Sequence, residues 1–496
     1  MSVSHDDTSA TSAPVPGVIP QLIAGEWTPG SGPAVTDENP SDLSAPLGVT
    51  HAAAPDEVSA AVESGAAALA SWSATAPQER AEILRRAAEI IAGEADDLAL
   101  GIAREVGKTI RDSLDEVHRA SDILRYVASS ALQPNGETYE SFRPGETIMT
   151  SRSPVGVVSI ITPFNFPLAI PAWKIGPALA YGNAVVWKPA GSVPATSRRL
   201  VAALLEAGLP PAVLNLVYGD ADVGQMLVSH DDVNAVSFTG STAVGREVIA
   251  RCGAYAKPIQ AGMGGVNPAI VLPDADLQDA AARVILGAFG ATGQKCSSTS
   301  RLLLHSGIAD RFIDELIEQV ANWRVGDPLI GSTDMGPLVS GPARDRVTGV
   351  VTEALTEGAN ILTGDDDVDT PSRASGYFVQ PTILELKDDR SPVWNTDVCG
   401  PVLSIIRVES WQEALEFANT GPYGLTASVF THDLKVIADA RRRLKVGILH
   451  VNSETTGADP HVPFGGDGDS GFGPREQGSS AKEFYTRLKT VYLRPF

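Results

Sequence analysis

The sequence predicts an α/β fold, in which parallel β-sheets carry helices on both faces over most of the 496 residues. Three observations predict it. From residue 153, short apolar runs alternate with stretches of helical periodicity, and a second alternating unit runs from 269 to about 430. A long helical region, 55–132, precedes both units. Strand–helix alternation favours parallel strands with crossover helices. At roughly 150 residues per domain, the length favours about three domains.

The helical region shows its start signals plainly. Pro55-Asp56-Glu57 opens one helix with acidic residues in its first turn, and Pro77-Gln78-Glu79-Arg80 opens a second. Apolar residues then recur at helical spacing at Ile83, Leu84, Ala87, Ile90 and Ile91. Two amphipathic helices are therefore expected here.

The two alternating units predict the following elements. In the first, the expected strands are 155–161, 184–187, 213–217 and 235–238, and the helices between them are 170–180, 195–207 and 242–250. In the second, a strand at 269–272 leads into helices at 275–289, 310–323 and 344–357. The stretch 485–493 alternates and is expected to form an edge strand.

Charge and cysteine content narrow the function classes. With 38 Lys and Arg against 60 Asp and Glu, the net charge is −22, which disfavours nucleic acid and anionic membrane surfaces as partners. The first basic residue is Arg80, and no apolar run reaches about 18 residues, so neither a secretory signal nor a membrane span is expected. Three widely spaced cysteines favour a cytoplasmic protein without disulfides. No His/Cys cluster has zinc-ligand spacing, so no metal is expected.

Cys296 is a candidate nucleophile. It stands in Gly293-Gln294-Lys295-Cys296-Ser297-Ser298, where a thiol between glycine and small polar residues can lie open in a cleft. The charge of Lys295 would favour the thiolate if its side chain points inward. The alternative is that Cys296 is a small buried apolar residue, as isolated cysteines commonly are.

Asn165 is a candidate oxyanion donor. It lies in Thr162-Pro163-Phe164-Asn165-Phe166-Pro167, directly after the expected strand 155–161. Two prolines restrict the backbone there, and ligands collect at the carboxyl ends of strands in α/β sheets. A side-chain amide at that place can donate to a developing oxyanion. The alternative is an asparagine that serves only the turn.

The segment 239–245 is a candidate phosphate-binding turn. It joins the expected strand 235–238 to the helix 242–250 and contains Gly240. Glycine lets the backbone approach a ligand closely, and the free N–H groups of a helix N-terminus favour phosphate. Gly240 and Gly245 lie five residues apart, which is not the usual dinucleotide fingerprint, so the pair is weak evidence taken alone.

In combination, the motifs resemble the aldehyde dehydrogenase superfamily over residues 20–496. Those in matching order and spacing are Trp187-Lys188-Pro189-Ala190, Thr239-Gly240-Ser241, Gly264-Gly265-Val266-Asn267-Pro268, Gly400-Pro401-Val402 and Pro463-Phe464-Gly465-Gly466. Within that superfamily the sequence looks most like the bacterial α-ketoglutarate semialdehyde dehydrogenases. The narrower likeness is carried by Gln294-Lys295-Cys296, His461-Val462-Pro463-Phe464-Gly465-Gly466 and Gly473-Pro474-Arg475-Glu476-Gln477-Gly478.

The resemblance implies an aldehyde dehydrogenase-like fold and an NAD(P)-dependent oxidation of an aldehyde. Cys296 would attack the carbonyl carbon, Asn165 and the Cys296 N–H would hold the oxyanion, and a thioester would remain on Cys296. Phe166, Trp173 and Phe464 would line the aldehyde tunnel, with plain core packing as the alternative. The implied cofactor contacts are Ile161, Thr162, Pro163, Phe164, Lys188, Ala190, Gly191, Ser192, Phe238, Gly240, Ser241 and Asp397.

Gly262 is the main departure from the family pattern. Related enzymes place a Glu there that activates the hydrolytic water, and Gly262 has no group that can take a proton. General-base assistance contributes about 10²–10⁴-fold, so hydrolysis of the thioester should be impaired or altered. Family members that pass the acyl group to coenzyme A also lack this Glu. Coenzyme A is therefore a possible acyl acceptor.

Two further departures concern the cofactor. Where NAD-preferring members carry a Glu three residues after Lys188, this chain has Gly191 and then Ser192, so a 2′-phosphate could pair with Lys188. NADP is therefore slightly favoured over NAD. Asp397 takes the place of a Glu that holds the nicotinamide ribose, and its shorter side chain predicts a loose contact. The neighbouring Cys399 is expected to be a packing residue rather than a redox group.

The resemblance also implies a domain organisation. Residues 1–18 are expected to be a disordered tail, and 19–134 with 153–261 a Rossmann-type cofactor domain. The α/β catalytic domain would span 262–465. A small β oligomerisation element would combine 135–152 with 480–496 in a homodimer or homotetramer.

Three readings of the function remain open. The first is a hydrolysing dehydrogenase for an aldehyde, such as a semialdehyde, that uses another base or unassisted water. The second is a coenzyme A-acylating dehydrogenase or thioester reductase. The third is a weakly active binding protein with the same fold, which intact Cys296 and Asn165 disfavour. Arg152 and Arg301 could meet a substrate carboxylate, but surface or ion-paired roles are favoured for both.

Overall fold

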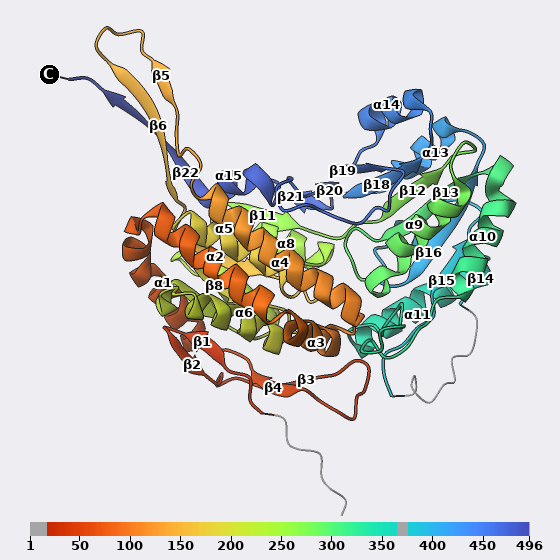
Figure 1. Ribbon diagram of the computed structural model, residues 1–496, viewed down its shortest axis with the longest axis horizontal. Helices are drawn as coiled ribbons and strands as arrows, with labels where there is room; N and C mark the ends of the chain where they lie inside the picture. The colour runs from red at the N-terminus through yellow and green to blue at the C-terminus, as the bar shows by residue number, and fades with distance from the viewer. Residues whose placement is uncertain (1–16, 365–374, 496) are drawn as a thin grey trace, which may run out of the picture.

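The computed structural model describes residues 17–364 and 375–495, which form two large sheets with helices on both faces and a projecting β-arm (Figure 1). Within the described residues, an eight-stranded sheet has the order β2-β1-β9-β8-β7-β10-β11-β21. A seven-stranded sheet has the order β14-β15-β16-β13-β12-β18-β19, and a three-stranded sheet, β22-β6-β5, forms the arm. The predicted α/β fold is therefore confirmed.

The strands and helices have the following bounds. The strands of the first sheet are β1 (Gln21–Ile23), β2 (Glu26–Thr28), β7 (Val157–Ile161), β8 (Ala184–Lys188), β9 (Leu214–Leu216), β10 (Val233–Thr239), β11 (Ile259–Gly262) and β21 (Gly471–Phe472). Those of the second are β12 (Asn267–Val271), β13 (Thr299–His305), β14 (Asn360–Thr363), β15 (Thr382–Glu385), β16 (Val402–Val408), β18 (Thr426–Phe430) and β19 (Ile448–Val451). The remaining strands are β3 (Ala34–Asp37), β4 (Gly48–His51), β5 (Thr138–Glu140), β6 (Thr147–Pro154), β17 (Tyr423–Gly424), β20 (Asp467–Gly468) and β22 (Thr486–Leu493). The helices are α1 (Pro55–Ala74), α2 (Pro77–Gly93), α3 (Ala95–Val106), α4 (Ile110–Ser130), α5 (Ala169–Ala180), α6 (Pro194–Glu206), α7 (Ala221–Ser229), α8 (Thr242–Ala254), α9 (Leu277–Phe289), α10 (Ala309–Ala321), α11 (Gly341–Thr356), α12 (Pro392–Asn395), α13 (Trp411–Ala418), α14 (Leu434–Arg443) and α15 (Ala481–Tyr485).

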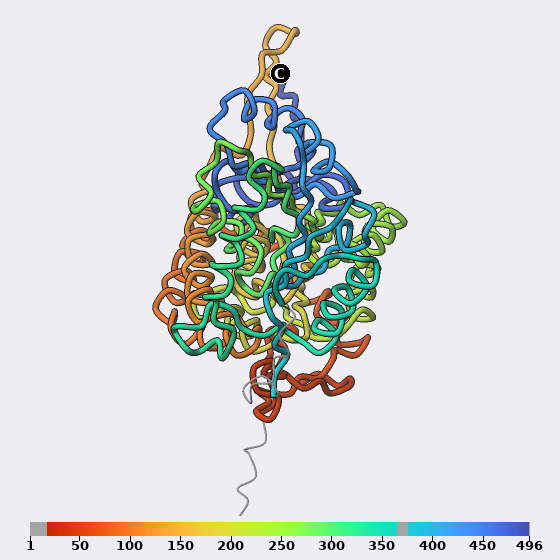
Figure 2. Tube along the Cα trace, turned by 90° about the vertical axis from the view of Figure 1, so that its right-hand side faces the viewer, coloured from red at the N-terminus to blue at the C-terminus, as the bar shows by residue number. Residues whose placement is uncertain are grey.

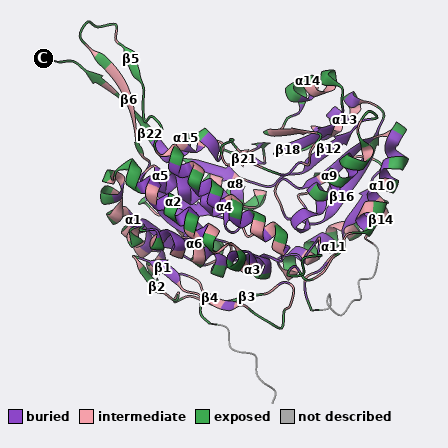
Figure 3. Ribbon diagram, viewed as in Figure 1, coloured by how far each residue is buried: buried purple, intermediate pink, exposed green. Residues whose placement is uncertain are grey.

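The first sheet owes its two covered faces to the alternation of side chains along each strand. In β7, Val158 and Ile160 pack into the core formed with α2 to α6, whereas Val157 and Ile161 pack into the core formed with α1, α7 and α8. Figure 3 shows the strands buried between these helices. β7 runs parallel to β8 on one side and β10 on the other, so their carboxyl ends share one edge. That edge is where α/β proteins bind ligands.

The second sheet repeats this design. Ile270 and Leu303 pack with α11, α13 and α14 on one face, and Val271 and Leu304 pack with α9 and α10 on the other. β12, β13, β16 and β18 are parallel neighbours. The expected strand 269–272 and helices 275–289, 310–323 and 344–357 correspond to β12, α9, α10 and α11 within a few residues.

Sequence patterns missed the edges of both sheets. β1 and β21 pair antiparallel with the parallel core of the first sheet, and β14 pairs antiparallel with β15 in the second. These strands have two to four residues, which is too short for a periodic signal. The nine-residue helix α7 was also not anticipated. The starts of α1 at Pro55 and α2 at Pro77 were predicted correctly, because proline favours the first turn.

The arm consists of β5, β6 and β22, and it projects from the body in both views (Figures 1 and 2). β22 pairs antiparallel with β6 over eight residues, from Thr486 opposite Pro154 to Leu493 opposite Thr147. The stretch 485–493 is thus an edge strand, as expected. Tyr139, Leu488 and Tyr492 are exposed along the arm.

The expected tail falls mostly outside the described residues. Its last residue, Val18, is described and forms a β-bridge with Val49. Among the helices that the structure describes, none is long and apolar enough to cross a membrane. We retain the sequence-based domain division as a proposal: the first sheet draws its main strands from 21–262, and the second draws its strands from 267–451.

Candidate active site

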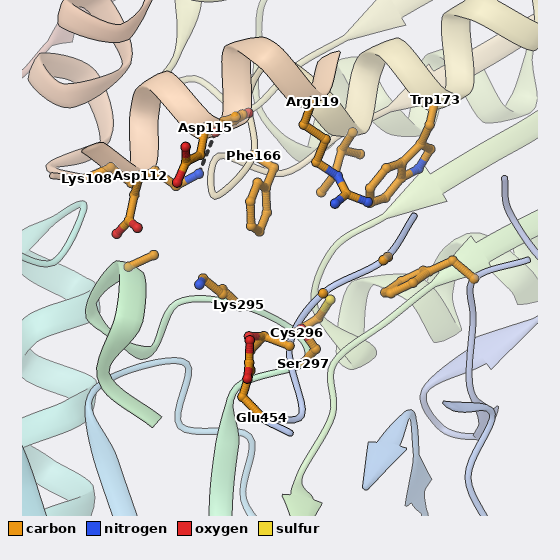
Figure 4. A pocket seen from close by; sticks show the side chains of 17 residues that line it. Lys108, Asp112, Asp115, Arg119, Phe166, Trp173, Lys295, Cys296, Ser297 and Glu454 are labelled. Atoms are coloured by element: carbon orange, nitrogen blue, oxygen red, sulfur yellow. Dashed lines mark hydrogen bonds and ion pairs between the residues drawn. The ribbon is translucent and has the colours of Figure 1, made fainter. Parts of the chain in front are cut away.

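Cys296 lines a cavity of about 270 Å³ formed by α4, α5 and the loops before β13 and around Phe464 (Figure 4). Segments far apart in the chain meet here. Beside Cys296, the lining includes Phe166, Trp173 and Phe464, the three aromatic residues expected to surround the aldehyde. The Trp173 and Phe464 rings lie 5.6 Å apart between centroids. The structure therefore brings these predicted site residues together.

A strained loop presents Cys296. Ala291 and Thr292 have positive φ angles of 52° and 59°, and Gly293 follows with φ 64°. A Cβ atom on Gly293 would lie 2.2 Å from the Gly400 carbonyl oxygen, so only glycine fits. Backbone strain of this kind persists where the surrounding structure enforces it, commonly at active sites.

Asn267 holds the loop from the other side. Its Nδ2 donates to the carbonyl oxygens of Cys296 and Ser298, both at 2.8 Å, and the residue is fully buried. Because these hydrogen bonds hold the Cys296 backbone in place, they also fix the direction in which the Cys296 side chain leaves it. In the sequence, Asn267 stands out only as part of the motif Gly264-Gly265-Val266-Asn267-Pro268, and no local signal indicates this positioning role.

The environment of Cys296 favours the thiol over the thiolate. Burial raises the pKa of the Cys296 thiol to about 12, and the negative charges of Asp397 and Glu476 act in the same direction. Backbone N–H groups of Cys296 and Ser297 oppose the shift. Lys295 does not compensate for the burial, so the activation expected from its charge is not found in this geometry.

Asn165 lies beside the nucleophile loop. One N–H of its Nδ2 donates to the Gln294 carbonyl oxygen at 2.7 Å. A side-chain amide nitrogen carries two hydrogens, so a second donor remains. The Asn165 Oδ1 atom is buried and has no hydrogen-bond partner among the described residues. The amide is thus oriented by Gln294, two residues before Cys296.

Gly262 is the last residue of β11, and the carboxylate of Glu476 lies next to it. A Cβ atom on Gly262 would lie 3.0 Å from Oε1 of Glu476. Glu476 is buried at 5% exposure. Its Oε1 accepts from Nζ of Lys174 at 2.9 Å, and its Oε2 accepts from Nε1 of Trp173 at 2.5 Å. A negatively charged group therefore occupies the neighbourhood of the missing Glu.

Lys174 completes this buried pair. Its Nζ also donates to Oγ of Ser237 at 2.9 Å, and burial lowers the pKa of the Lys174 ammonium while Glu476 opposes the shift. Nothing in the local sequence marked Glu476 or Lys174 for this role. They lie 302 residues apart, and no short motif spans that separation.

A second cavity, of about 790 Å³, lies at the carboxyl edge of the first sheet. Five of the residues predicted to contact the cofactor line it: Ile161, Lys188, Ala190, Gly191 and Phe238. The cavity also touches Val244 in the first turn of α8, where Oγ of Ser241 caps the helix by accepting from the Val244 N–H at 3.4 Å. A Cβ atom on Gly240 would lie 2.6 Å from the Phe238 ring, so glycine keeps this turn tight.

Lys188 is the central cation of this cavity. Its Nζ donates to the carbonyl oxygens of Gly219 at 2.7 Å and Pro189 at 3.2 Å. Burial lowers the pKa of the Lys188 ammonium to about 8, and the charge of Asp220 opposes that shift. Arg251 also lines the cavity and donates to Ser229 and Gln225. The sequence analysis missed both Asp220 and Arg251.

The remaining predicted cofactor residues lie outside the residues that line this cavity. Oγ1 of Thr162 accepts from Nε1 of Trp187 at 2.9 Å, and Pro163 and Phe164 continue the turn towards Asn165. Ser192 follows Gly191. Asp397 lies against the Gly264 backbone near Cys296, and burial raises the pKa of its carboxyl to about 6. Burial also raises the pKa of the neighbouring Cys399 thiol, to about 12.

Neither Arg152 nor Arg301 points at the nucleophile. Arg152 pairs with Glu483 at 2.6 Å in the arm. Arg301 is buried and donates to Trp394 O, Thr420 O and Oδ1 of Asn395. The ion-paired role favoured for Arg152 is confirmed, whereas Arg301 lies in the core with neutral partners and is neither at the surface nor ion-paired.

Comparison with known proteins identifies the family. The model of the aldehyde dehydrogenase family matches residues 27–491. The chain belongs to the aldehyde dehydrogenase family. The α-ketoglutaric semialdehyde dehydrogenase of Bacillus subtilis is 38% identical over 96% of this chain and 98% of the relative.

Two solved structures show the same fold. Betaine aldehyde dehydrogenase from Staphylococcus aureus, in complex with NAD⁺, has a TM-score of 0.93 and 30% identity over 96% of this chain and 95% of that one. An E. coli NADP dependent enzyme has a TM-score of 0.92 and 31% identity over 96% and 98%. The chain is thus an NAD(P)-dependent aldehyde dehydrogenase, and the predicted resemblance is confirmed.

Proposed function

We propose that this aldehyde dehydrogenase works through a thioester on Cys296. The Cys296 sulfur adds to the aldehyde carbon, and the carbonyl oxygen becomes an oxyanion that accepts from the second N–H of Asn165 and the Cys296 backbone N–H. A nicotinamide cofactor held at the second cavity, by residues that include Lys188 and Gly191, would supply the hydride acceptor for this oxidation. Water then displaces the sulfur, which releases the carboxylic acid and restores the thiol.

We assign the activation of that water to Glu476. The supporting observation is the 3.0 Å separation between Oε1 of Glu476 and the position that a Cβ on Gly262 would take. Because Gly262 has no side chain, no side chain at that position covers this carboxylate. Lys174 and Trp173 hold the carboxylate in place. Oε1 also accepts from Oγ1 of Thr239 at 3.5 Å, so the lone pair left for a water is on Oε2.

The alternative is transfer of the acyl group to coenzyme A. The observation that favours it is the lack of a general-base side chain at Gly262. A thiolate needs no general base at that step. Under this alternative the Glu476 carboxylate would have only a structural role.

Stopped-flow measurement of NAD(P)H formation separates the two. With Glu476 as base, the wild type turns over steadily and is indifferent to coenzyme A. Glu476→Gln then shows a rapid first turnover followed by slow release, with steady hydrolysis lower by about 10²–10⁴-fold. A wild-type burst whose slow phase coenzyme A removes would establish the acylating reaction instead.

Two controls keep this test sharp. Glu454→Gln removes another carboxylate that lines the Cys296 cavity, and it should leave the steady rate nearly unchanged. Glu476→Gln leaves Lys174 as an unpaired buried cation, which can destabilise the fold. The double variant Lys174→Met with Glu476→Gln removes both charges and should show the same burst.

The residues that line the second cavity indicate which cofactor the protein prefers. We propose NADP with a slight preference over NAD, because Lys188 and Arg251 line the cavity and Gly191 presents no carboxylate. Asp220 and Glu247 line it too and oppose a 2′-phosphate.

We propose a semialdehyde as the substrate, because the Bacillus subtilis relative is an α-ketoglutaric semialdehyde dehydrogenase. The exposed arm is the proposed contact between copies in a homo-oligomer.

A further inference from the structure

Arg119 is a cation of the cavity around Cys296 that has no ion-pair partner among the described residues. Arg119 lies on α4 and lines the cavity with Phe166 and Trp173. In Figure 4 its guanidinium extends from the helix between these two rings, on the side of the cavity opposite Cys296. Its Nη2 atom is buried and has no hydrogen-bond partner among the described residues.

The other charged groups of the cavity leave Arg119 largely uncompensated. Glu116 is already engaged: it pairs with Lys108 at 2.5 Å and accepts from the Leu168 and Ala169 N–H groups. Burial lowers the pKa of the Arg119 guanidinium, and Asp459 and Glu116 oppose that shift only by charge. Buried guanidinium groups are ordinarily paired, so an unpaired one at a cavity wall indicates a missing anion.

Lys295 is the other cation that lines this cavity and has no ion-pair partner in the described part of the chain. It lies in the electrostatic field of Asp112, Glu454 and Asp115, which offset its charge. These acids also line the cavity. Arg119, by contrast, has a buried nitrogen, Nη2, that no group among the described residues accepts from. It is therefore the group best placed to attract an anionic substrate.

We propose that Arg119 binds an anionic group, a carboxylate, on the aldehyde substrate. A guanidinium offers two parallel N–H donors that match a carboxylate, and such pairs are among the stronger hydrogen bonds in proteins. Arg119 and Cys296 line the same cavity, so the bound substrate would be a short chain with an aldehyde at one end and a carboxylate at the other. A cationic aldehyde would be repelled. This assignment rests on the proposed oxidation at Cys296 and adds the substrate class.

The test compares two aldehydes of equal carbon number. Succinic semialdehyde carries a carboxylate, and butanal is neutral. In Arg119→Met, the ratio of kcat/KM for succinic semialdehyde to that for butanal should fall by about 10- to 100-fold, chiefly through KM. Arg119→Lys should keep part of the preference, because it retains charge but loses the paired donors.

A matched variant on the same helix is Arg125→Met. Arg125 pairs with Asp122 at 3.0 Å on the exposed face of α4, so its loss should leave the ratio within twofold. Arg119→Met should also melt no lower than the wild type, because it removes a buried charge without a partner. A merely structural Arg119 would instead lower the melting temperature and affect both aldehydes equally.

The outcomes are separable. An unchanged substrate ratio in Arg119→Met overturns the assignment of Arg119. A wild type that prefers butanal, or that accepts betaine aldehyde as well as succinic semialdehyde, overturns the anionic substrate class. Failure to form NAD(P)H with any aldehyde in the wild type would instead contradict the oxidation itself.

Discussion

The two cavities of this protein are built in different ways. The cofactor cavity is lined by residues from a continuous stretch, 161–255, in which strands and helices follow one another along the chain. The Cys296 cavity gathers residues from 108 to 464, contributed by α4, α5 and loops of both sheets. The first is mainly apolar around Lys188. The second concentrates Lys108, Glu116, Arg119 and Lys295 around one thiol.

This difference separates a general function from a particular one. Cofactor binding needs a strand edge and a helix N-terminus, which a local sequence pattern can specify. Substrate choice and the handling of the thioester depend on charges brought together by tertiary contacts. Changes in the Cys296 cavity should therefore alter chemistry and selectivity, whereas changes in the cofactor cavity should alter cofactor affinity.

The largest expected effect is at the nucleophile. Cys296→Ala should reduce NAD(P)H formation by at least about 10⁴-fold. The reason is that no other cysteine is among the described residues that line the cavity. Cofactor binding, followed by fluorescence titration, should persist because the second cavity is untouched. Cys252→Ala is the control, as that thiol is buried in the first core. Substantial activity in Cys296→Ala would end the proposed mechanism.

The pH dependence comes next in size. Because burial raises the pKa of the Cys296 thiol to about 12, the thiolate is the minor form throughout the neutral range. Its fraction rises about tenfold per pH unit below that pKa, so alkylation of Cys296 by iodoacetamide should rise likewise between pH 7 and 9. Mass spectrometry of the Cys296 peptide gives the rate.

The same measurement links the thiol to Glu476. The negative charge of Glu476 raises the pKa of Cys296, so Glu476→Gln should move the alkylation profile to lower pH. Glu454→Gln again serves as the control. A wild-type rate that levels off below pH 8 would show that the thiolate is stabilised by a group outside the cavity described above.

The smallest expected effect concerns cofactor choice. NADP should bind at least as tightly as NAD, and Gly191→Glu should shift preference towards NAD by about tenfold, because a carboxylate repels the 2′-phosphate. A Cβ on Gly191 meets nothing within 4 Å, so the variant should fold. Asp220→Asn should shift preference the other way. Titration that finds NAD clearly tighter in the wild type would contradict the assignment.

The preference for NADP over NAD should depend on pH through Lys188. Burial lowers the pKa of the Lys188 ammonium to about 8, so its charge is present below that pH and lost above it. Affinity for NADP should accordingly weaken as the pH rises through 8, more than affinity for NAD does. The matched measurement is the ratio of the two dissociation constants at pH 7 and pH 9.

Much of the fold was predictable because it is locally encoded. The strands β7, β8 and β10 are continuous apolar runs, as strands buried on both faces must be, and Pro55 and Pro77 mark helix starts by chemistry of their own. The short edge strands and α7 were not predictable to the same degree. An edge strand of two or three residues forms because a neighbour offers hydrogen-bonding groups, and nothing in its own sequence requires it.

The sequence by itself determined the α/β architecture, and it predicted the nucleophile Cys296, the oxyanion donor Asn165 and the missing carboxylate at Gly262. Each depends on a residue type next to its chain neighbours. Only the tertiary structure decided that Glu476 lies against Gly262, that Asn267 holds the Cys296 loop, and that Arg119 lines the cavity without a partner. The physical reason is that these roles depend on burial and on distances between residues far apart in the chain, which no local pattern records.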